Sequence, residues 1–152
     1  MILVTEPRAA LAAWLRERVP HLGDPGPAVP IGVVGRRGLV AVVMFHGYQP
    51  ACRDIQISMA ASSPRWATRA VLGALLAYPF RQLGCGRVTT ITPARNERAI
   101  RFNEGIGFVR EGVVRRGFGD DDAVICGLLR EDAARWLGED HGQEQSVAAA
   151  CA

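Results

Sequence analysis

Two apolar runs and one alternating stretch in the first half of the chain are typical of β-strands. Residues 31–34 and 39–48 are two apolar runs, and the Gly-Arg-Arg-Gly sequence at 35–38 is typical of a hairpin turn between them. Residues 54–60 alternate apolar side chains at the odd positions with polar or small ones at the even positions. The pattern therefore predicts an antiparallel meander of three strands.

Apolar residues also recur at helical spacing before and after this meander. Residues 7–19 carry one apolar stripe, and 71–80 carry another. Ser63 is a good N-cap residue and Pro64 suits the first position of a helix. We therefore expect the longest helix of the chain to begin there and to end before Gly84.

The stretch from 87 to 116 predicts a strand, a short helix and a return strand. Its first part, 88–92, is rich in β-branched residues, which favour a half-buried pleated surface. Asn96 is a good N-cap for a helix whose apolar positions recur up to Ile106. Gly105 and Gly107 are then expected to end that helix, and a valine-rich strand follows.

After a Gly/Asp turn at 117–121, a final strand and a helix at 131–137 complete the predicted elements. The chain of 152 residues is long enough to bury about two-thirds of its unfolded surface in one core. We therefore expect residues 1–137 to form a single domain. Residues 138–152 are polar and then alanine-rich without periodicity, which predicts a mobile C-terminal tail.

Composition and charge narrow the class of protein. A hydrophobic content of 49% with 22% charged residues is typical of a compact domain, and a net charge of +3 does not by itself indicate nucleic acid. The four cysteines are scattered without metal-ligand spacing, so no metal site is expected. We found no signal peptide pattern and no run near the roughly 20 apolar residues of a membrane span, and therefore expect a cytoplasmic protein without a membrane partner.

The second half also contains short motifs at characteristic spacings. These are Asn96-x-x-Ala99, Gly107-Phe108-x-x-Glu111-Gly112, Arg115, and the strand-to-helix run at 122–131. Together they resemble the closing half of the GNAT N-acetyltransferases, and more narrowly the ribosomal-protein, small-molecule and phage-type members. The resemblance extends roughly over residues 31–137. It implies an α/β fold with a mixed, mostly antiparallel central sheet flanked by helices.

The resemblance also implies a function and a donor site. The implied reaction is direct transfer of acetyl from acetyl-CoA to a primary amine of a small molecule or a protein. In the family the pantetheine arm lies along the third strand, and the pyrophosphate lies at the N-terminus of the next helix over a glycine-containing loop. That loop corresponds to residues 63–68 here, and it contains no glycine. The implied cofactor-binding residues are Ser58, Met59, Ala60, Arg65, Trp66, Ala67, Thr68, Arg69, Asn96 and Asn103.

Several of these residues also have a purely structural interpretation. Asn96 is implied to bind the pantetheine arm, but it is equally suited to be a plain helix cap. Arg65 and Arg69 suit a solvated helix start, and Trp66 suits core packing. Asn103 falls where many family members have a tyrosine that protonates the leaving thiolate, and an amide cannot act as an acid.

Candidate catalytic residues lie on the predicted strands. Asp54 and Gln56 share one face of the third strand, and Asp54 is the ionisable one that can serve as a general base. His46 and Tyr48 share a face of the neighbouring strand, so we expect them to reach the same cleft and contact the substrate. Each is also compatible with an ordinary structural or surface role.

The arginine-rich second half leaves an alternative function open. Its arginines can form a solvated face, a groove for the CoA 3′-phosphate or an anionic substrate, or a nucleic-acid surface. The alternative to the enzyme is therefore a non-catalytic or nucleic-acid-directed GNAT-like module with an altered cofactor loop. A homodimer is also considered, because many relatives pair.

Overall fold

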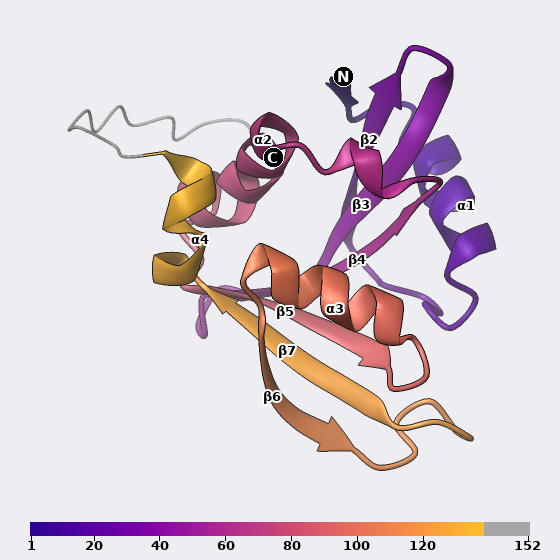
Figure 1. Ribbon diagram of the computed structural model, residues 1–152, viewed down its shortest axis with the longest axis vertical. Coiled ribbons are helices and arrows are strands. Elements are labelled where there is room, and N and C mark those ends of the chain that lie inside the picture. Colours follow the sequence, from indigo (N-terminus) through magenta and orange to yellow (C-terminus); the bar gives the residue numbers. More distant parts are fainter. Residues whose placement is uncertain (139–152) are drawn as a thin grey trace.

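The computed structural model describes residues 1–138, which form one seven-stranded sheet with helices on both faces (Figure 1). The strands are β1 (Ile2–Val4), β2 (Ala28–Gly35), β3 (Gly38–Gln49), β4 (Asp54–Ala61), β5 (Arg87–Pro93), β6 (Val109–Val114) and β7 (Ala123–Leu129). The helical elements are α1 (Arg8–Arg18), the 3₁₀ turn η1 (Pro64–Trp66), α2 (Arg69–Ala77), the π-helical turn η2 (Tyr78–Gln82), α3 (Glu97–Ile106) and α4 (Arg130–Leu137). The tail predicted from residue 138 lies outside the described residues, apart from Gly138.

The strand order is β1-β2-β3-β4-β5-β7-β6. Only the central pair, β4 with β5, is parallel, and every other neighbouring pair is antiparallel. The predicted mixed, mostly antiparallel sheet is confirmed, as is the hairpin between β2 and β3. Within residues 1–138 no helix has the length and apolar character needed to cross a membrane.

Each face of the sheet has its own hydrophobic core. The larger core lies between the sheet and α2, α3 and α4, and its fully buried members include Phe45 and Phe80. The smaller one lies under α1, where Leu11 and Leu15 pack on Val42 and Met44. Because side chains alternate along a strand, β3 and β4 contribute to both cores.

The predicted start of the longest helix is wrong. Ser63 does act as a cap, since its side chain accepts a hydrogen bond from the N–H of Arg65, but it caps only the three-residue turn η1. Thr68 then returns to an extended conformation and caps Val71, so that α2 begins at Arg69. A second capping residue close behind the first thus divides the expected helix in two, and α1, with 11 residues, is the longest of the described helices.

Two glycines in helices are expected to respond in opposite ways to replacement by alanine. A Cβ on Gly73 in α2 would lie 2.5 Å from the main-chain oxygen of Trp136 in α4, whereas a Cβ on Gly105 in α3 would have no neighbour within 4 Å. We expect Gly105→Ala to stabilise the fold by about 0.4–1 kcal/mol, because alanine restricts the unfolded chain. Gly73→Ala should destabilise it by about 1–3 kcal/mol through overpacking. Urea unfolding of both variants tests this, and stabilisation by both would contradict the close α2–α4 contact.

Candidate functional site

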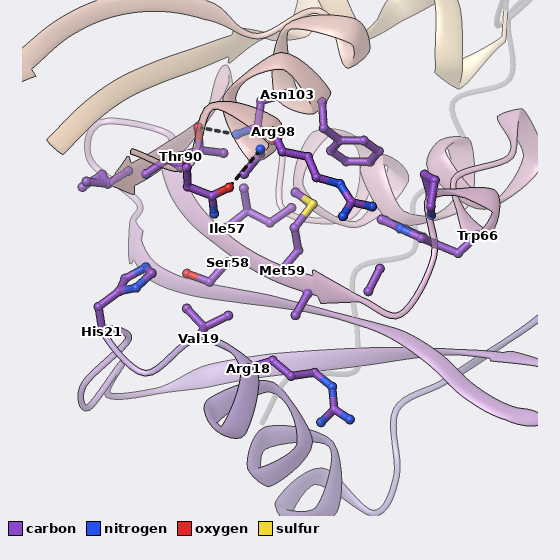
Figure 2. Close-up of a pocket in the computed structure, with 18 of the residues that line it drawn as sticks. Arg18, Val19, His21, Ile57, Ser58, Met59, Trp66, Thr90, Arg98 and Asn103 are labelled. Atoms are coloured by element: carbon purple, nitrogen blue, oxygen red, sulfur yellow. Dashed lines mark hydrogen bonds between the residues drawn. The ribbon is translucent and has the colours of Figure 1, made fainter. Parts of the chain in front are cut away.

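The central strands β4 and β5 separate along their length. They pair over only three residues each, Asp54–Gln56 with Arg87–Thr89, and we call this paired end the vertex. β4 continues to Ala61 and β5 to Pro93, so beyond the vertex their facing edges have no strand partner among residues 1–138. A cavity of about 420 Å³ lies there, with β4 and β5 as its long sides (Figure 2).

α3 covers the cavity with its first turn and one of its sides. The Oδ1 atom of Asn96 accepts a hydrogen bond from the N–H of Ala99 at 3.2 Å, which confirms Asn96 as the N-cap. The buried Asn103 amide donates to Oγ1 of Thr90 on β5 at 3.4 Å. Asn103 therefore holds the helix against the cavity wall, and the exposed N–H groups of the first turn favour an anionic or carbonyl ligand.

One end of the cavity combines an aromatic wall with a cation. Trp66 of η1 is buried and packs on the ring of Phe102 at 5.9 Å between centroids. Arg98 extends from α3 across the same end, and among the described residues its guanidinium has no hydrogen bond or ion pair (Figure 2). By contrast, Arg101 on the same helix bonds to Glu97 at 2.8 Å.

Much of the arginine-rich second half is neutralised by neighbouring carboxylates. These ion pairs are Arg87 with Glu111, Arg95 with Asp120, Arg101 with Glu97, and Arg110 with Glu104. The solvated-face interpretation therefore accounts for the exposed Arg95, Arg101 and Arg110, whereas Arg87 is partly buried at the vertex. Among the arginines of the second half that the structure describes, Arg98 lines the cavity.

The other end of the cavity is closed by the segment that follows α1. Val19 and His21 line it together with Ser58 of β4, at the end away from Trp66 (Figure 2). Arg18, the last residue of α1, also lines the cavity, and its guanidinium donates to the main-chain oxygen of Trp14 and is paired with Glu17. The ring of His21 contacts Phe118 edge-on at 4.7 Å, and burial lowers the pKa of His21. No carboxylate occurs among the described residues that line the cavity.

Ser58 connects this end of the cavity to His46 on the neighbouring strand. The Nε2 atom of His46 lies 2.9 Å from the Ser58 hydroxyl oxygen, within hydrogen-bond distance. His46 is partly buried on the α1 face of the sheet, and this desolvation lowers its pKa. The imidazole is therefore neutral at neutral pH and able to accept a proton.

Tyr48 does not share a face with His46, contrary to the prediction. A β-bulge interrupts the β3–β4 register between His46 and Gln49, and Gly47 there has a φ of +60°. The extra residue reverses the alternation, so the Tyr48 hydroxyl donates to the main-chain oxygen of Leu83 at 3.5 Å. Tyr48 thus lies away from the cavity, whereas His46 reaches it through Ser58.

Asp54 lies at the vertex and is already bonded. Its Oδ1 accepts a hydrogen bond from the Thr89 hydroxyl at 2.9 Å and lies 3.5 Å from Nε of Arg87. Arg87 also donates to both carboxylate oxygens of Glu111, at 3.1 and 2.7 Å, and this hydrogen bonding lowers the pKa of Glu111. Neither Asp54 nor Gln56 lines the cavity, so the structure does not place the expected general base within it.

Comparison with solved structures identifies the fold. A Vibrio cholerae spermidine N-acetyltransferase SpeG variant aligns at a TM-score of 0.66 and 16% identity over 88% of this chain and 97% of its own. A T. thermophilus protein assigned as an acetyltransferase aligns at 0.67 and 24% identity over 88% and 90%. A dodecameric V. cholerae spermidine N-acetyltransferase aligns at 0.66 and 17% identity over 86% and 94%.

The chain has the GNAT fold. No protein-family model matches the chain, and no curated protein matches it significantly in sequence. The resemblance in the second half of the sequence therefore predicted the fold correctly. At these identities the comparisons establish the architecture, and the chemistry of the site depends on this chain's own residues.

On the GNAT fold, the predicted cofactor residues divide into two sets. Those that line the cavity are Ser58, Met59, Ala60, Trp66, Asn96 and Asn103, and those that do not are Arg65, Ala67, Thr68 and Arg69. Arg69 is turned toward α4, where its guanidinium donates to the main-chain oxygen of Arg135. Thr68 uses its hydroxyl as the N-cap of α2. The later start of α2 moves these residues away from the gap between the strands.

Sequence reasoning missed the part of the site that comes from α1. Arg18, Val19 and His21 lie far from the recognised motifs, and their only sequence signal was their place at or just after the end of an amphipathic helix. On the facing wall, Thr90 and Thr92 were assigned to a strand without a site role. In a β-branched run, the sequence does not distinguish a threonine that lines a cavity from one that packs in the core.

Proposed function

We propose that the chain is an acetyl-CoA-dependent N-acetyltransferase that transfers the acetyl group directly to a primary amine. The observation that supports this most is the cavity between the unpaired edges of β4 and β5. A free strand edge presents main-chain N–H and C=O groups at regular spacing, and an extended ligand with amide groups can add to it as a partial strand. The pantetheine arm of CoA has two amides in an extended chain and suits this edge.

The donor is proposed to lie with its acetyl group toward the vertex. Ser58 of β4 and Thr90 of β5 come within two residues of the paired segment, whereas Trp66 and Arg98 lie at the other end. A thin thioester suits the narrow part of a gap between diverging strands. The pyrophosphate would then lie at the wide end, where Arg98 and the first turn of α3 attract negative charge.

The glycine-free loop does not remove this anion site. η1 packs Trp66 into the core, so the loop does not bring its main chain as close to the phosphates as glycines would allow. Arg98 on the opposite wall is proposed to supply the missing interaction. The residues that hold the donor are thus strand edges and a guanidinium, and acetyl-CoA supplies the activated acyl group.

The acceptor is proposed to enter at the end formed by Val19, His21 and Ser58. The similar structures include a spermidine N-acetyltransferase, but the described cavity wall here has no carboxylate to bind the several positive charges of a polyamine. Arg18 on that wall is itself a cation, although it is paired with Glu17. We therefore propose an acceptor with a single amine rather than a polyamine. Direct transfer is favoured because Cys126 is fully buried and burial raises the pKa of its thiol, which leaves it a poor nucleophile.

Calorimetry and thiol release test the proposal. We expect acetyl-CoA to bind with a Kd in the micromolar range, equivalent to about −8 kcal/mol, with desulfo-CoA as a non-reactive control. Thiol release should then depend on an added amine from a panel of Ala-Gly-Gly, glycinamide, ethanolamine and spermidine, with spermidine the poorest. Absence of binding up to about millimolar donor, together with absence of amine-dependent thiol release, would overturn the proposed function.

A further inference from the structure

We propose that Ser58 and His46 form a proton relay that deprotonates the acceptor amine, with Ser58 in contact with the amine and His46 as the final proton acceptor. The inference rests on the proposed function, for which it supplies the general base. It reassigns two residues that the sequence associated with donor and substrate binding.

The geometry places the pair between the cavity and the sheet interior. The Ser58 hydroxyl is on the cavity wall, and His46 behind it does not line the cavity. The Ser58 hydroxyl oxygen lies 2.9 Å from Nε2 of His46, within hydrogen-bond distance. A proton leaving an amine in the cavity can therefore reach the imidazole in two short transfers through one hydroxyl.

The surroundings of His46 keep it available as a base. In register with it lie Ala28 on β2 and Gln56 on β4, neither of which is charged. On β4 the nearest carboxylate is Asp54, which Thr89 and Arg87 already engage. From the α1 side, His21 and Arg18 line the cavity together with Ser58, and Arg18 is paired with Glu17. Desolvation alone accounts for the lowered pKa of His46, so the imidazole is neutral through the neutral range.

The proposed step conserves atoms and charge. The acceptor ammonium gives one proton to the Ser58 hydroxyl as the hydroxyl proton passes to Nε2 of His46, which requires the tautomer with its proton on Nδ1. The free amine then attacks the thioester carbonyl, and a carbon–nitrogen bond forms. As the adduct collapses, the carbon–sulfur bond breaks and the departing sulfur takes the second nitrogen proton. The products are the amide and the CoA thiol, and the imidazolium returns its proton to solvent.

The alternative bases in the structure fit less well. Asp54 and Glu111 belong to the vertex network around Arg87. His21 lines the cavity, but its ring is in contact with Phe118, and within residues 1–138 no hydrogen bond to a second group is described for it. The relay is the arrangement in which a cavity hydroxyl is already bonded to a neutral imidazole.

The test is the pH dependence of kcat/KM for acetyl transfer to the panel amine that the wild-type chain acetylates fastest. Wild type should lose activity on the acid side with a midpoint below 6.5 and stay nearly level above it. His46→Gln can keep a hydrogen bond to Ser58 but cannot take up the proton. Its kcat/KM should follow the free-amine fraction, rising about 100-fold between about pH 6 and 8 for an amine whose pKa is above 8.

Two further variants keep the result decisive. Ser58→Ala should give the same steep profile as His46→Gln, whereas His21→Gln should keep the wild-type acid limb whatever it does to the rate. All variants should bind acetyl-CoA within about twofold of wild type, which shows that the cavity is intact. The relay would be overturned if His46→Gln kept the wild-type pH profile, or if only His21→Gln lost that profile. Either result would leave the proposed transferase activity in place. A wild-type chain that acetylates none of the panel amines would instead overturn the proposed function, and the relay with it.

Discussion

Replacing Arg98 with glutamate is expected to raise the Kd of acetyl-CoA about 100-fold, or roughly 2.7 kcal/mol. The change removes a guanidinium that faces the wide end of the cavity without a carboxylate partner in the described chain, and it puts a negative charge next to the pyrophosphate. A hydrogen bond to a charged group contributes about 1.5–3 kcal/mol, which is the size of the expected loss. Calorimetry with acetyl-CoA measures it directly.

Arg101→Glu is the matched control for this prediction. It makes the same charge change on the same helix, but Arg101 is 73% exposed and already paired with Glu97. We expect its effect on the Kd to be less than about threefold, because solvent and salt screen an exposed charge. Acetyl-pantetheine, which lacks the pyrophosphate, should bind both variants alike. An equal loss of acetyl-CoA affinity in the two variants would mean that Arg98 acts through net charge and not through its position.

Leu15→Ala is expected to lower the free energy of unfolding by about 2–5 kcal/mol. Leu15 is fully buried in the small core where α1 meets β3, next to Val42 and Met44. Removing its branched end leaves a space that so small a core is poorly able to refill. Urea unfolding of the whole chain reports the difference as a lower midpoint.

The matched control is Leu129→Ala, the same substitution at a side chain that is 42% exposed. There we expect a change of no more than about 0.5–1 kcal/mol. Val19 and His21 follow directly from α1, so Leu15→Ala should also weaken the acceptor end of the site. Similar destabilisation by both substitutions would show that α1 is not packed on the sheet as described.

The sequence predicted those parts of the fold that short-range patterns determine. The turn at Gly35–Gly38, the alternation along β4 and the cap at Asn96 depend on residues within a few positions of each other. These appear in the structure as expected. The general GNAT-like architecture followed from the motifs after β5, and it too is confirmed.

The errors arose where a single extra residue or a second signal changed the outcome. The bulge at Gly47 is invisible to an alternation argument, and it moves Tyr48 to the face opposite His46. Thr68 is also a favourable capping residue, as Ser63 is, and sequence alone does not tell which of them starts the long helix.

The composition of the site depended on contacts between distant segments. In the sequence nothing near Asp54 indicates a partner for its carboxylate, whereas in the structure Thr89 and Arg87 contact it at the vertex. Arg98 and Arg101 look alike in the sequence, and only the tertiary structure shows which one faces the cavity. Such differences depend on packing, so no local pattern predicts them.

The vertex between β4 and β5 also limits the size of the group that can be transferred. There the two strands are joined by their main-chain ladder, and the side chains of Asp54, Thr89 and Arg87 reinforce the junction. In the proposed transferase, each carbon added to the acyl group would extend it toward this junction, where the strands no longer part. In that transferase, the network that engages Asp54 would thus also limit the length of the acyl chain.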